Sequence, residues 1–185
     1  MTAIVGVIDD KYVWIGGDSA SANDSTLCTA AQPKVFENNS GMIIGYTSSW
    51  RMGQLLQYKL DMGKLPHINV ENVIEFMITD FVDSVRECFK GSGFSKVVDN
   101  EETGGDFIVG FRGSLFTIFE DFSVLSYSDG YTAVGSGVEF ALGSLYTTRD
   151  GEGAKKRVEL ALGAASYHNP YVQGPFHILK QQRNK

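Results

Sequence analysis

Thr2 is the residue of this chain whose position could carry chemistry by itself. It follows Met1 and opens the apolar run Ala3 to Val7. A small second residue is what methionine aminopeptidases accept, so removal of Met1 would leave a threonine with both a free amine and a hydroxyl. A terminal amine titrates near neutral pH and can take the hydroxyl proton, so one residue can hold a nucleophile and its own base. Many proteins begin Met-Thr without this use, so other residues must supply the rest of a site.

The histidines and cysteines, which often form catalytic or metal sites, do not have the spacing that such sites require. His67, His168 and His177 are scattered along the chain, which argues against a zinc site or a Ser-His-Asp triad. Cys28 and Cys88 form no C-x-x-C pair, and we interpret them as free thiols in a reducing compartment. The sequence also lacks a nucleotide-binding loop. We therefore expect neither a metal nor a cofactor.

The overall composition disfavours several classes of protein. The chain of 185 residues has a formal net charge of -6, whereas a nucleic-acid binder needs a basic surface to neutralise phosphates. No stretch approaches the roughly 18 apolar residues of a membrane span. Asp9 and Asp10 interrupt the first apolar run too early for a signal peptide. We expect one cytoplasmic domain over residues 1–185, with a flexible tail at 180–185.

Residues 1–50 are expected to be almost entirely β-structure. Apolar and β-branched residues gather in short segments that polar or glycine-bearing turns separate. The predicted strands are 3–8, 12–17, 34–36 and 42–47. The first two are expected to pair as a hairpin, and residues 19–29 are predicted to form a loop or an irregular edge.

Two helices are predicted next, and the second has the strongest periodicity in the chain. Residues 50–60 carry apolar side chains at the spacing of one helical face. We expect Asn69 to cap the following helix, in which apolar residues recur at steps of three and four until Gly91. These apolar positions are Val70, Val73, Ile74, Met77, Phe81, Val85 and Cys88.

The second half of the chain shows the same order of strands and helices. After a predicted loop at 97–105, the expected elements are strands at 106–112, 114–120, 122–127 and 131–134, helices at 138–146 and 154–167, and a strand at 175–179. Blocks of strands separated by helices favour an α+β fold. They indicate two antiparallel sheets covered by helix layers rather than alternating βαβ units.

Four segments of the sequence also follow one another in a familiar order. They are Thr2-Ala3-Ile4-Val5-Gly6-Val7, Ile15-Gly16-Gly17-Asp18-Ser19-Ala20, Pro33-Lys34-Val35 and Ala133-Val134-Gly135-Ser136-Gly137-Val138. In order and approximate spacing they resemble the proteasome β-type peptidases, the N-terminal nucleophile hydrolases that include the bacterial heat-shock-locus peptidase. The resemblance extends over nearly the whole chain. It implies a four-layer αββα sandwich and a threonine-type endopeptidase.

The resemblance implies a role for each of three polar residues near the N-terminus. Thr2 would be the nucleophile, Lys34 would lie beneath it, and Asp18 would pair with Lys34. The chemistry is consistent, because a threonine hydroxyl needs an adjacent base and a buried cation favours the loss of a nearby proton. Each residue also has an ordinary explanation, since Asp18 follows two glycines in a turn-like segment and a strand-edge lysine is commonly a solvated charge.

Supporting groups are implied in the same way. Ser136, between Gly135 and Gly137, would contact the terminal amine, although it could instead be a simple helix cap. The backbone N–H of Ser48 would stabilise an oxyanion. The family commonly has two glycines at this loop, and serine resists the positive φ that glycine permits.

A second departure from the family pattern lies near the C-terminus. Asn169 and Val172 stand where an aspartate and a serine support the nucleophile in proteasome-type subunits. Asn169 can donate and accept hydrogen bonds, but it carries no charge.

Three hypotheses on function stay open. The first is a peptidase of peptides or unfolded proteins, assembled as a hexameric or heptameric ring that can stack in pairs, with any ATP-dependent unfoldase on a separate chain. The second is a catalytically inactive ring or scaffold subunit, as Ser48 and Asn169 suggest and as retention of Met1 would require. The third is a small-molecule amide hydrolase, because the nucleophile fixes the reaction class and not the substrate.

Overall fold

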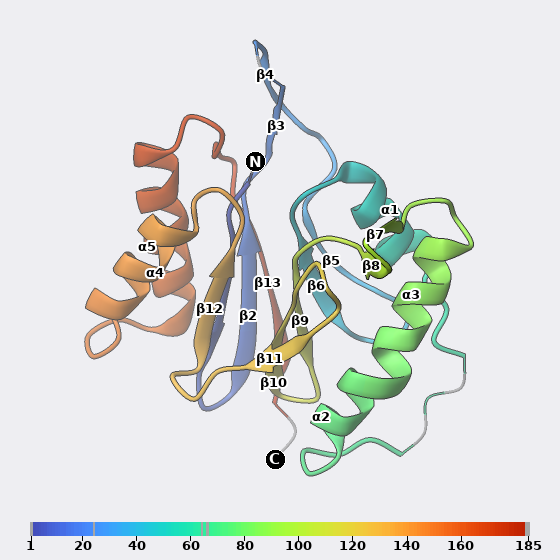
Figure 1. Cartoon of the computed structure of the whole chain (residues 1–185). Helices are drawn as coiled ribbons and strands as arrows, with labels where there is room; N and C mark the ends of the chain where they lie inside the picture. The colour runs from blue at the N-terminus through green and yellow to red at the C-terminus, as the bar shows by residue number, and fades with distance from the viewer. Residues whose placement is uncertain (1, 24, 64, 66, 184–185) are drawn as a thin grey trace.

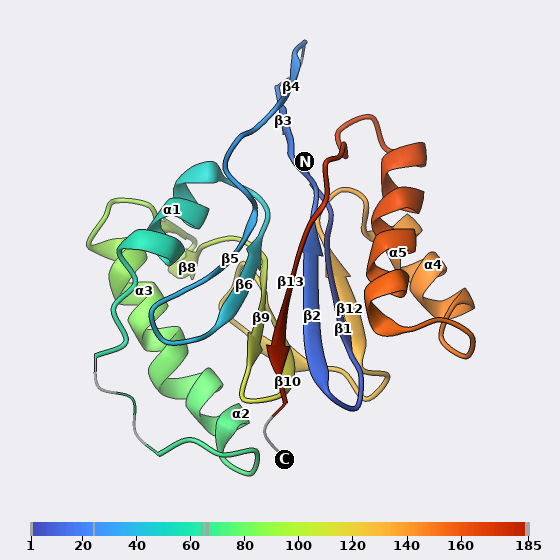
Figure 2. The ribbon, with the colours of Figure 1, turned by 180° about the vertical axis from the view of Figure 1, so that it is seen from behind.

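Two antiparallel sheets lie face to face, and helices cover the outer side of each (Figure 1, Figure 2). The computed structural model describes residues 2–23, 25–63, 65 and 67–183. Helices from the first half of the chain cover one sheet, and helices from the second half cover the other. The α+β class and the four-layer αββα sandwich predicted from the sequence are confirmed.

The first sheet contains the N-terminal hairpin. Strands β1 (Ile4–Ile8) and β2 (Tyr12–Gly17) form this hairpin as predicted. Strand β12 (Tyr131–Val134) pairs with β1 and strand β13 (His177–Gln182) pairs with β2, both antiparallel. The order β12-β1-β2-β13 therefore places the start of the chain in the middle of the sheet.

Strand β13 extends further than the sequence predicted. It continues to Gln182, which pairs with Tyr12, and the Arg183 N–H donates to the Lys11 carbonyl at 2.8 Å. The prediction of a flexible tail is wrong for residues 180–183, and residues 184–185 lie outside the described residues. Because β13 is an edge strand, its backbone is held by hydrogen bonds while polar side chains face solvent. The end of this strand therefore shows no apolar pattern from which it could be predicted.

The second sheet has the order β11-β10-β9-β6-β5. Its strands are β5 (Val35–Glu37), β6 (Ile43–Tyr46), β9 (Phe107–Phe111), β10 (Ser114–Ile118) and β11 (Val124–Ser126). All five were predicted to within a few residues, including the β9–β10 hairpin. Apolar side chains from both sheets fill the space between them, and this cluster includes Ile4, Ile15, Val35 and Ile108.

Two short hairpins replace predicted loops. They are β3 (Ala20–Ala22) with β4 (Leu27–Thr29), and β7 (Lys96–Val98) with β8 (Glu101–Thr103). Most of their side chains are partly or fully exposed, so neither hairpin needs alternating apolar residues and the sequence shows none. The β3–β4 hairpin projects beyond both sheets at the end of the molecule that carries the N-terminus (Figure 1).

The helices of the first half cover the second sheet. They are α1 (Trp50–Tyr58), α2 (Val73–Phe76), the π-helical turn η1 (Met77–Phe81) and α3 (Val82–Lys90). The prediction that Asn69 caps the second helix is wrong. Its side chain instead accepts from the N–H groups of Glu71 and Asn72 in a separate turn, the helix begins at Val73, and Val70 is 58% exposed. The predicted stop at Gly91 is confirmed.

The helices of the second half cover the first sheet. They are α4 (Val138–Thr147) and α5 (Ala154–His168), close to the predicted bounds. Their buried side chains pack on Ala3, Val5 and Val7 of the N-terminal segment. Among the described residues, no helix combines the length and apolar character needed to cross a membrane.

Candidate active site

Three of the predicted site residues meet where the two sheets approach each other. Thr2 precedes β1 and Asp18 follows β2, and the register of this antiparallel pair brings them together. Lys34 precedes β5 in the opposite sheet. Gly17 allows this close approach, because a Cβ there would lie 2.7 Å from Ile4 Cδ1 and 2.9 Å from Val35 Cγ2.

Asp18 is fully buried and organises the contacts at this point. Its Oδ1 accepts from Thr2 Oγ1 at 2.9 Å, from the Ala3 N–H at 3.1 Å and from Lys34 Nζ at 3.0 Å. Its Oδ2 accepts from the Ala20 N–H at 2.8 Å and from Lys34 Nζ at 3.1 Å. A buried carboxylate with this many donors is well compensated for its lost hydration.

The Lys34 ammonium contacts both partners. It donates to Thr2 Oγ1 as well as to Asp18, and the residue is only 4% exposed. Burial lowers the pKa of Lys34, and the Asp18 carboxylate opposes that effect. A cation held against the hydroxyl stabilises developing negative charge on Oγ1, so the arrangement can activate Thr2 as a nucleophile.

Ser136 lies on the other side of Thr2. The Thr2 N–H donates to Ser136 Oγ at 3.1 Å, and Ser136 Oγ is 3.3 Å from the Thr2 carbonyl oxygen. The adjacent glycines are needed for close packing. Gly135 has a φ of +100°, and a Cβ there would lie 2.4 Å from the Thr2 carbonyl oxygen. A Cβ on Gly137 would lie 2.9 Å from Ala165 Cβ.

Ser48 adopts the conformation that its side chain disfavours. Its φ is 59°, in the left-handed region. Thr47 supports this geometry, because its Oγ1 donates to the Asp106 carbonyl at 2.9 Å and lies 3.1 Å from Ser48 Oγ. Gly105 leaves space, since a Cβ there would be 2.9 Å from Ser48 Oγ. No described residue accepts a hydrogen bond from the Ser48 N–H, so this donor is free for a ligand.

Replacing Ser48 by glycine should stabilise the fold while it keeps the N–H. Glycine adopts positive φ without the steric cost that a Cβ imposes on serine. This gain exceeds the larger conformational entropy that glycine loses on folding. We expect the free energy of unfolding to rise by about 0.5–1 kcal/mol in urea denaturation. Ser49→Ala is the matched control, because Ser49 caps α1 and its loss should lower stability by about 1 kcal/mol. Destabilisation by Ser48→Gly would contradict this account of the loop.

Asn169 and Val172 support Ser136 and its surroundings rather than Thr2 directly. Asn169 Nδ2 donates to the Ser136 carbonyl at 2.6 Å, and its Oδ1 accepts from the Tyr171 N–H at 2.9 Å. Val172 is 2% exposed and packs with Ala3 and Ala165 in the apolar cluster under β1. At this position the chain therefore has an apolar contact where the family pattern has a hydroxyl.

Solved structures with the same arrangement of elements identify the fold. BPH of Thiobacillus denitrificans in complex with epoxomicin aligns with a TM-score of 0.82 at 15% identity, covering 99% of this chain and 100% of that one. Eukaryotic HslV from Trypanosoma brucei gives a TM-score of 0.70 at 20% identity, covering 98% and 99%. The chain has the proteasome β-type fold. Anbu, an ancestral beta-subunit from Yersinia bercovieri, aligns at 0.67 and 13% identity, covering 96% and 80%.

The relationship is detected through the fold and not through sequence. No family model and no curated protein sequence matches the chain. On this proteasome β-type fold, the structure brings together Thr2, Asp18, Lys34 and Ser136, which the sequence had singled out. Their catalytic roles, and that of the Ser48 N–H, remain predictions.

A cleft of about 130 Å³ opens beside Thr2. The cleft is lined by Thr2, Ala20, Ala22, Lys34 and residues 46–50. Trp50 was not predicted to be a site residue. Its place at the start of a predicted helix, two residues after the expected oxyanion donor Ser48, is the signal that could have identified it. The indole of Trp50 lies 5.7 Å from Lys34 Nζ, so it also helps to shield the lysine from water.

Proposed function

We propose that this chain is a threonine-type endopeptidase whose nucleophile is Thr2, exposed by removal of Met1. Met1 itself lies outside the described residues. The observation that carries the proposal is the set of contacts at Thr2. Its Oγ1 contacts Lys34 Nζ and lies 2.9 Å from Asp18 Oδ1, while its nitrogen lies 3.1 Å from Ser136 Oγ. Nucleophile, cation and amine partner thus converge beside an open cleft.

The proposed reaction uses each of these groups. Thr2 Oγ1 attacks a peptide carbonyl and its proton passes to the Thr2 amine, which Ser136 orients. Lys34 stabilises negative charge on Oγ1, and the Ser48 N–H stabilises the tetrahedral oxyanion. The C–N bond then breaks and the leaving amine takes the proton from the Thr2 ammonium. Water, deprotonated by the same amine, hydrolyses the acyl ester and restores the threonine.

We also propose that the chain works as a homo-oligomeric ring, hexameric or heptameric, with any unfoldase as a separate protein. The sequence resemblance supports this organisation. Large apolar side chains on the outer helices are consistent with it, because Ile78 and Tyr167 are 54% and 86% exposed. Such side chains are candidates for subunit contacts.

A non-catalytic subunit is the second candidate. The strained backbone of Ser48 and the buried Val172 are the observations that favour it. A small-amide hydrolase is the third, and the small size of the cleft beside Thr2 favours it.

Replacing Thr2 by alanine tests the proposal. In protein shown by mass spectrometry to lack Met1, we expect Thr2→Ala to lower the hydrolysis of fluorogenic peptides at least about 1,000-fold, because the variant lacks the hydroxyl that forms the acyl ester in the proposed reaction. Thr147→Ala, at an exposed threonine on α4, should leave the rate unchanged.

The other outcomes separate the alternatives. A protein that lacks Met1 but hydrolyses neither peptides nor small acyl amides would be a scaffold subunit. A protein that hydrolyses small amides and no peptides would be an amide hydrolase.

A further inference from the structure

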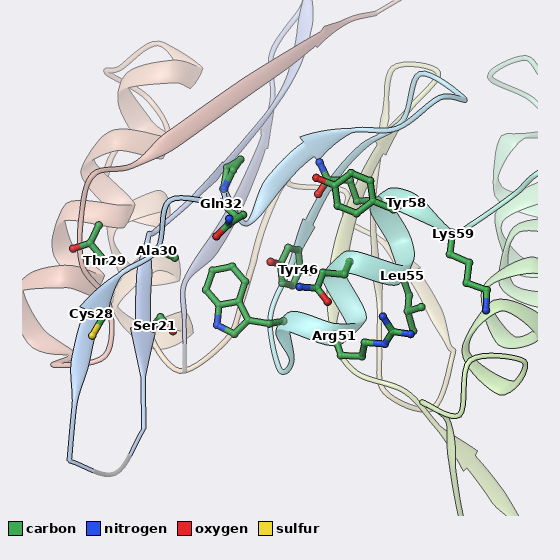
Figure 3. Close-up of a pocket in the computed structure, with 14 residues that line it drawn as sticks. Ser21, Cys28, Thr29, Ala30, Gln32, Tyr46, Arg51, Leu55, Tyr58 and Lys59 are labelled. Carbon is green, nitrogen blue, oxygen red and sulfur yellow. The ribbon is translucent and has the colours of Figure 1, made fainter.

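A groove of about 790 Å³ lies over α1, next to the cleft at Thr2. Tyr46 and Trp50 line both cavities, so the groove continues directly from the candidate nucleophile. Figure 3 shows Ser21 and Cys28 of the β3–β4 hairpin at one side and Lys59 at the opposite side. A ligand that leaves the cleft past Trp50 therefore enters this groove.

The lining combines aromatic, amide and cationic groups. The aromatic residues are Tyr46, Trp50 and Tyr58, the amides are Gln32, Gln54 and Gln57, and the cations are Arg51 and Lys59. None of the lining residues is acidic, although the whole chain has 22 acidic and 16 basic residues. The groove therefore differs in charge from the rest of a negatively charged protein.

The two cations are available to a ligand. Arg51 and Lys59 are both exposed, and neither forms an ion pair with any described residue. Arg51 lies in the first turn of α1, and Lys59 is the residue that caps its C-terminal end. Burial raises the pKa of the Cys88 thiol, and the charges of Arg51 and Lys59 both act against this rise. The two cations therefore lie near the same thiol. Their positive potentials add in one region.

The aromatic side chains offer apolar contact beside this charge. Tyr58 is 77% exposed at the end of α1, and its ring is free on the groove side of the helix (Figure 3). An extended peptide could stack side chains on Trp50 and Tyr58 and hydrogen-bond to the glutamine amides.

We propose that this groove binds the substrate segment next to the scissile bond and selects peptides with an acidic side chain there, through Arg51 and Lys59. The inference rests on the proposed peptidase function. It adds the substrate class, acidic peptides, and names two residues that determine specificity.

A binding measurement tests the inference separately from catalysis. Two dye-labelled peptides of equal length, identical except for a run of two Glu or two Gln, are titrated into the full-length Thr2→Ala protein at low salt. We expect the Glu peptide to bind about fivefold more tightly by fluorescence anisotropy, and the difference to shrink in 0.5 M salt. The Arg51→Gln, Lys59→Gln double variant should remove the difference. The exposed cations Arg149 and Lys155 provide the control pair, and their replacement by Gln should change nothing.

The possible results distinguish this inference from the proposed function. Equal binding of both peptides, or an unchanged preference in the double variant, would overturn acidic selection. If the protein with Thr2 cleaves both peptides at equal kcat/KM, the peptidase proposal stands and the inference fails. If the Glu preference in binding depends on Arg51 and Lys59 but no peptide is cleaved, the groove is an acidic-peptide site on a non-catalytic subunit.

Discussion

Replacing Lys34 by methionine should lower kcat/KM for peptide hydrolysis roughly 1,000-fold, the largest loss that we expect from any residue other than Thr2. Methionine preserves much of the side-chain volume but removes the cation that contacts Thr2 Oγ1. The loss should appear in kcat rather than KM, because the charge acts on the reacting oxygen. Lys11→Met, at an exposed lysine in the β1–β2 turn, is the control and should leave kcat unchanged.

The pH dependence gives a second measurement of the same group. Burial lowers the pKa of Lys34 below the ordinary value of 10.5. If the cationic form is the active one, the rate should fall on the alkaline side before pH 10.5, as Lys34 loses its proton. Lys34→Arg should move that alkaline limb to higher pH, because a guanidinium keeps its charge. An alkaline limb that stays in place in Lys34→Arg would contradict the role given to Lys34.

Replacing Asp18 by asparagine should cause the largest loss of stability. The amide cannot accept from all the donors that surround Asp18, and it leaves the Lys34 charge buried without its counter-ion. Removing one partner of a buried pair costs about 3–5 kcal/mol. Urea denaturation at pH 7 should show a decrease of this size. The exposed Asp10 provides the matched control, and Asp10→Asn should have little effect.

A double-mutant cycle shows whether the pair acts as a unit. The Asp18→Asn, Lys34→Met protein no longer holds an unpaired buried charge, so its loss of stability should be smaller than the sum of the two single losses. Additive losses would mean that the 3.0 Å contact between Lys34 and Asp18 contributes no coupling energy.

Much of the fold could be predicted because its central elements bury apolar side chains with a clear period. Strands β1, β2, β9 and β10 alternate or run apolar against two buried faces, and the hairpin geometry follows from adjacent strands. The proximity of Thr2 and Asp18 is consistent with the predicted hairpin, because the two residues flank it. The contact with Lys34 in the opposite sheet could be expected only from the family resemblance.

The strands that the sequence did not predict share a physical cause. The β3–β4 hairpin and the end of β13 are held by backbone hydrogen bonds and expose many of their side chains, so their sequences carry no apolar period. Asparagine is a residue type that commonly caps helices, but the side chain of Asn69 stabilises the turn that precedes the helix. The left-handed φ of Ser48 depends on Thr47 and Gly105, and Gly105 is far away in sequence.

The central claim is that Thr2 acts as an N-terminal nucleophile, and intact-mass spectrometry after treatment with epoxomicin tests it most directly. Epoxomicin is the ligand of the BPH structure that shares this fold. The account predicts a protein that has lost Met1 and gains the mass of one epoxomicin per chain, with peptide mapping locating the adduct on Thr2 and no adduct in Thr2→Ala. Complete retention of Met1, or a protein without Met1 that forms no adduct at Thr2, would contradict it.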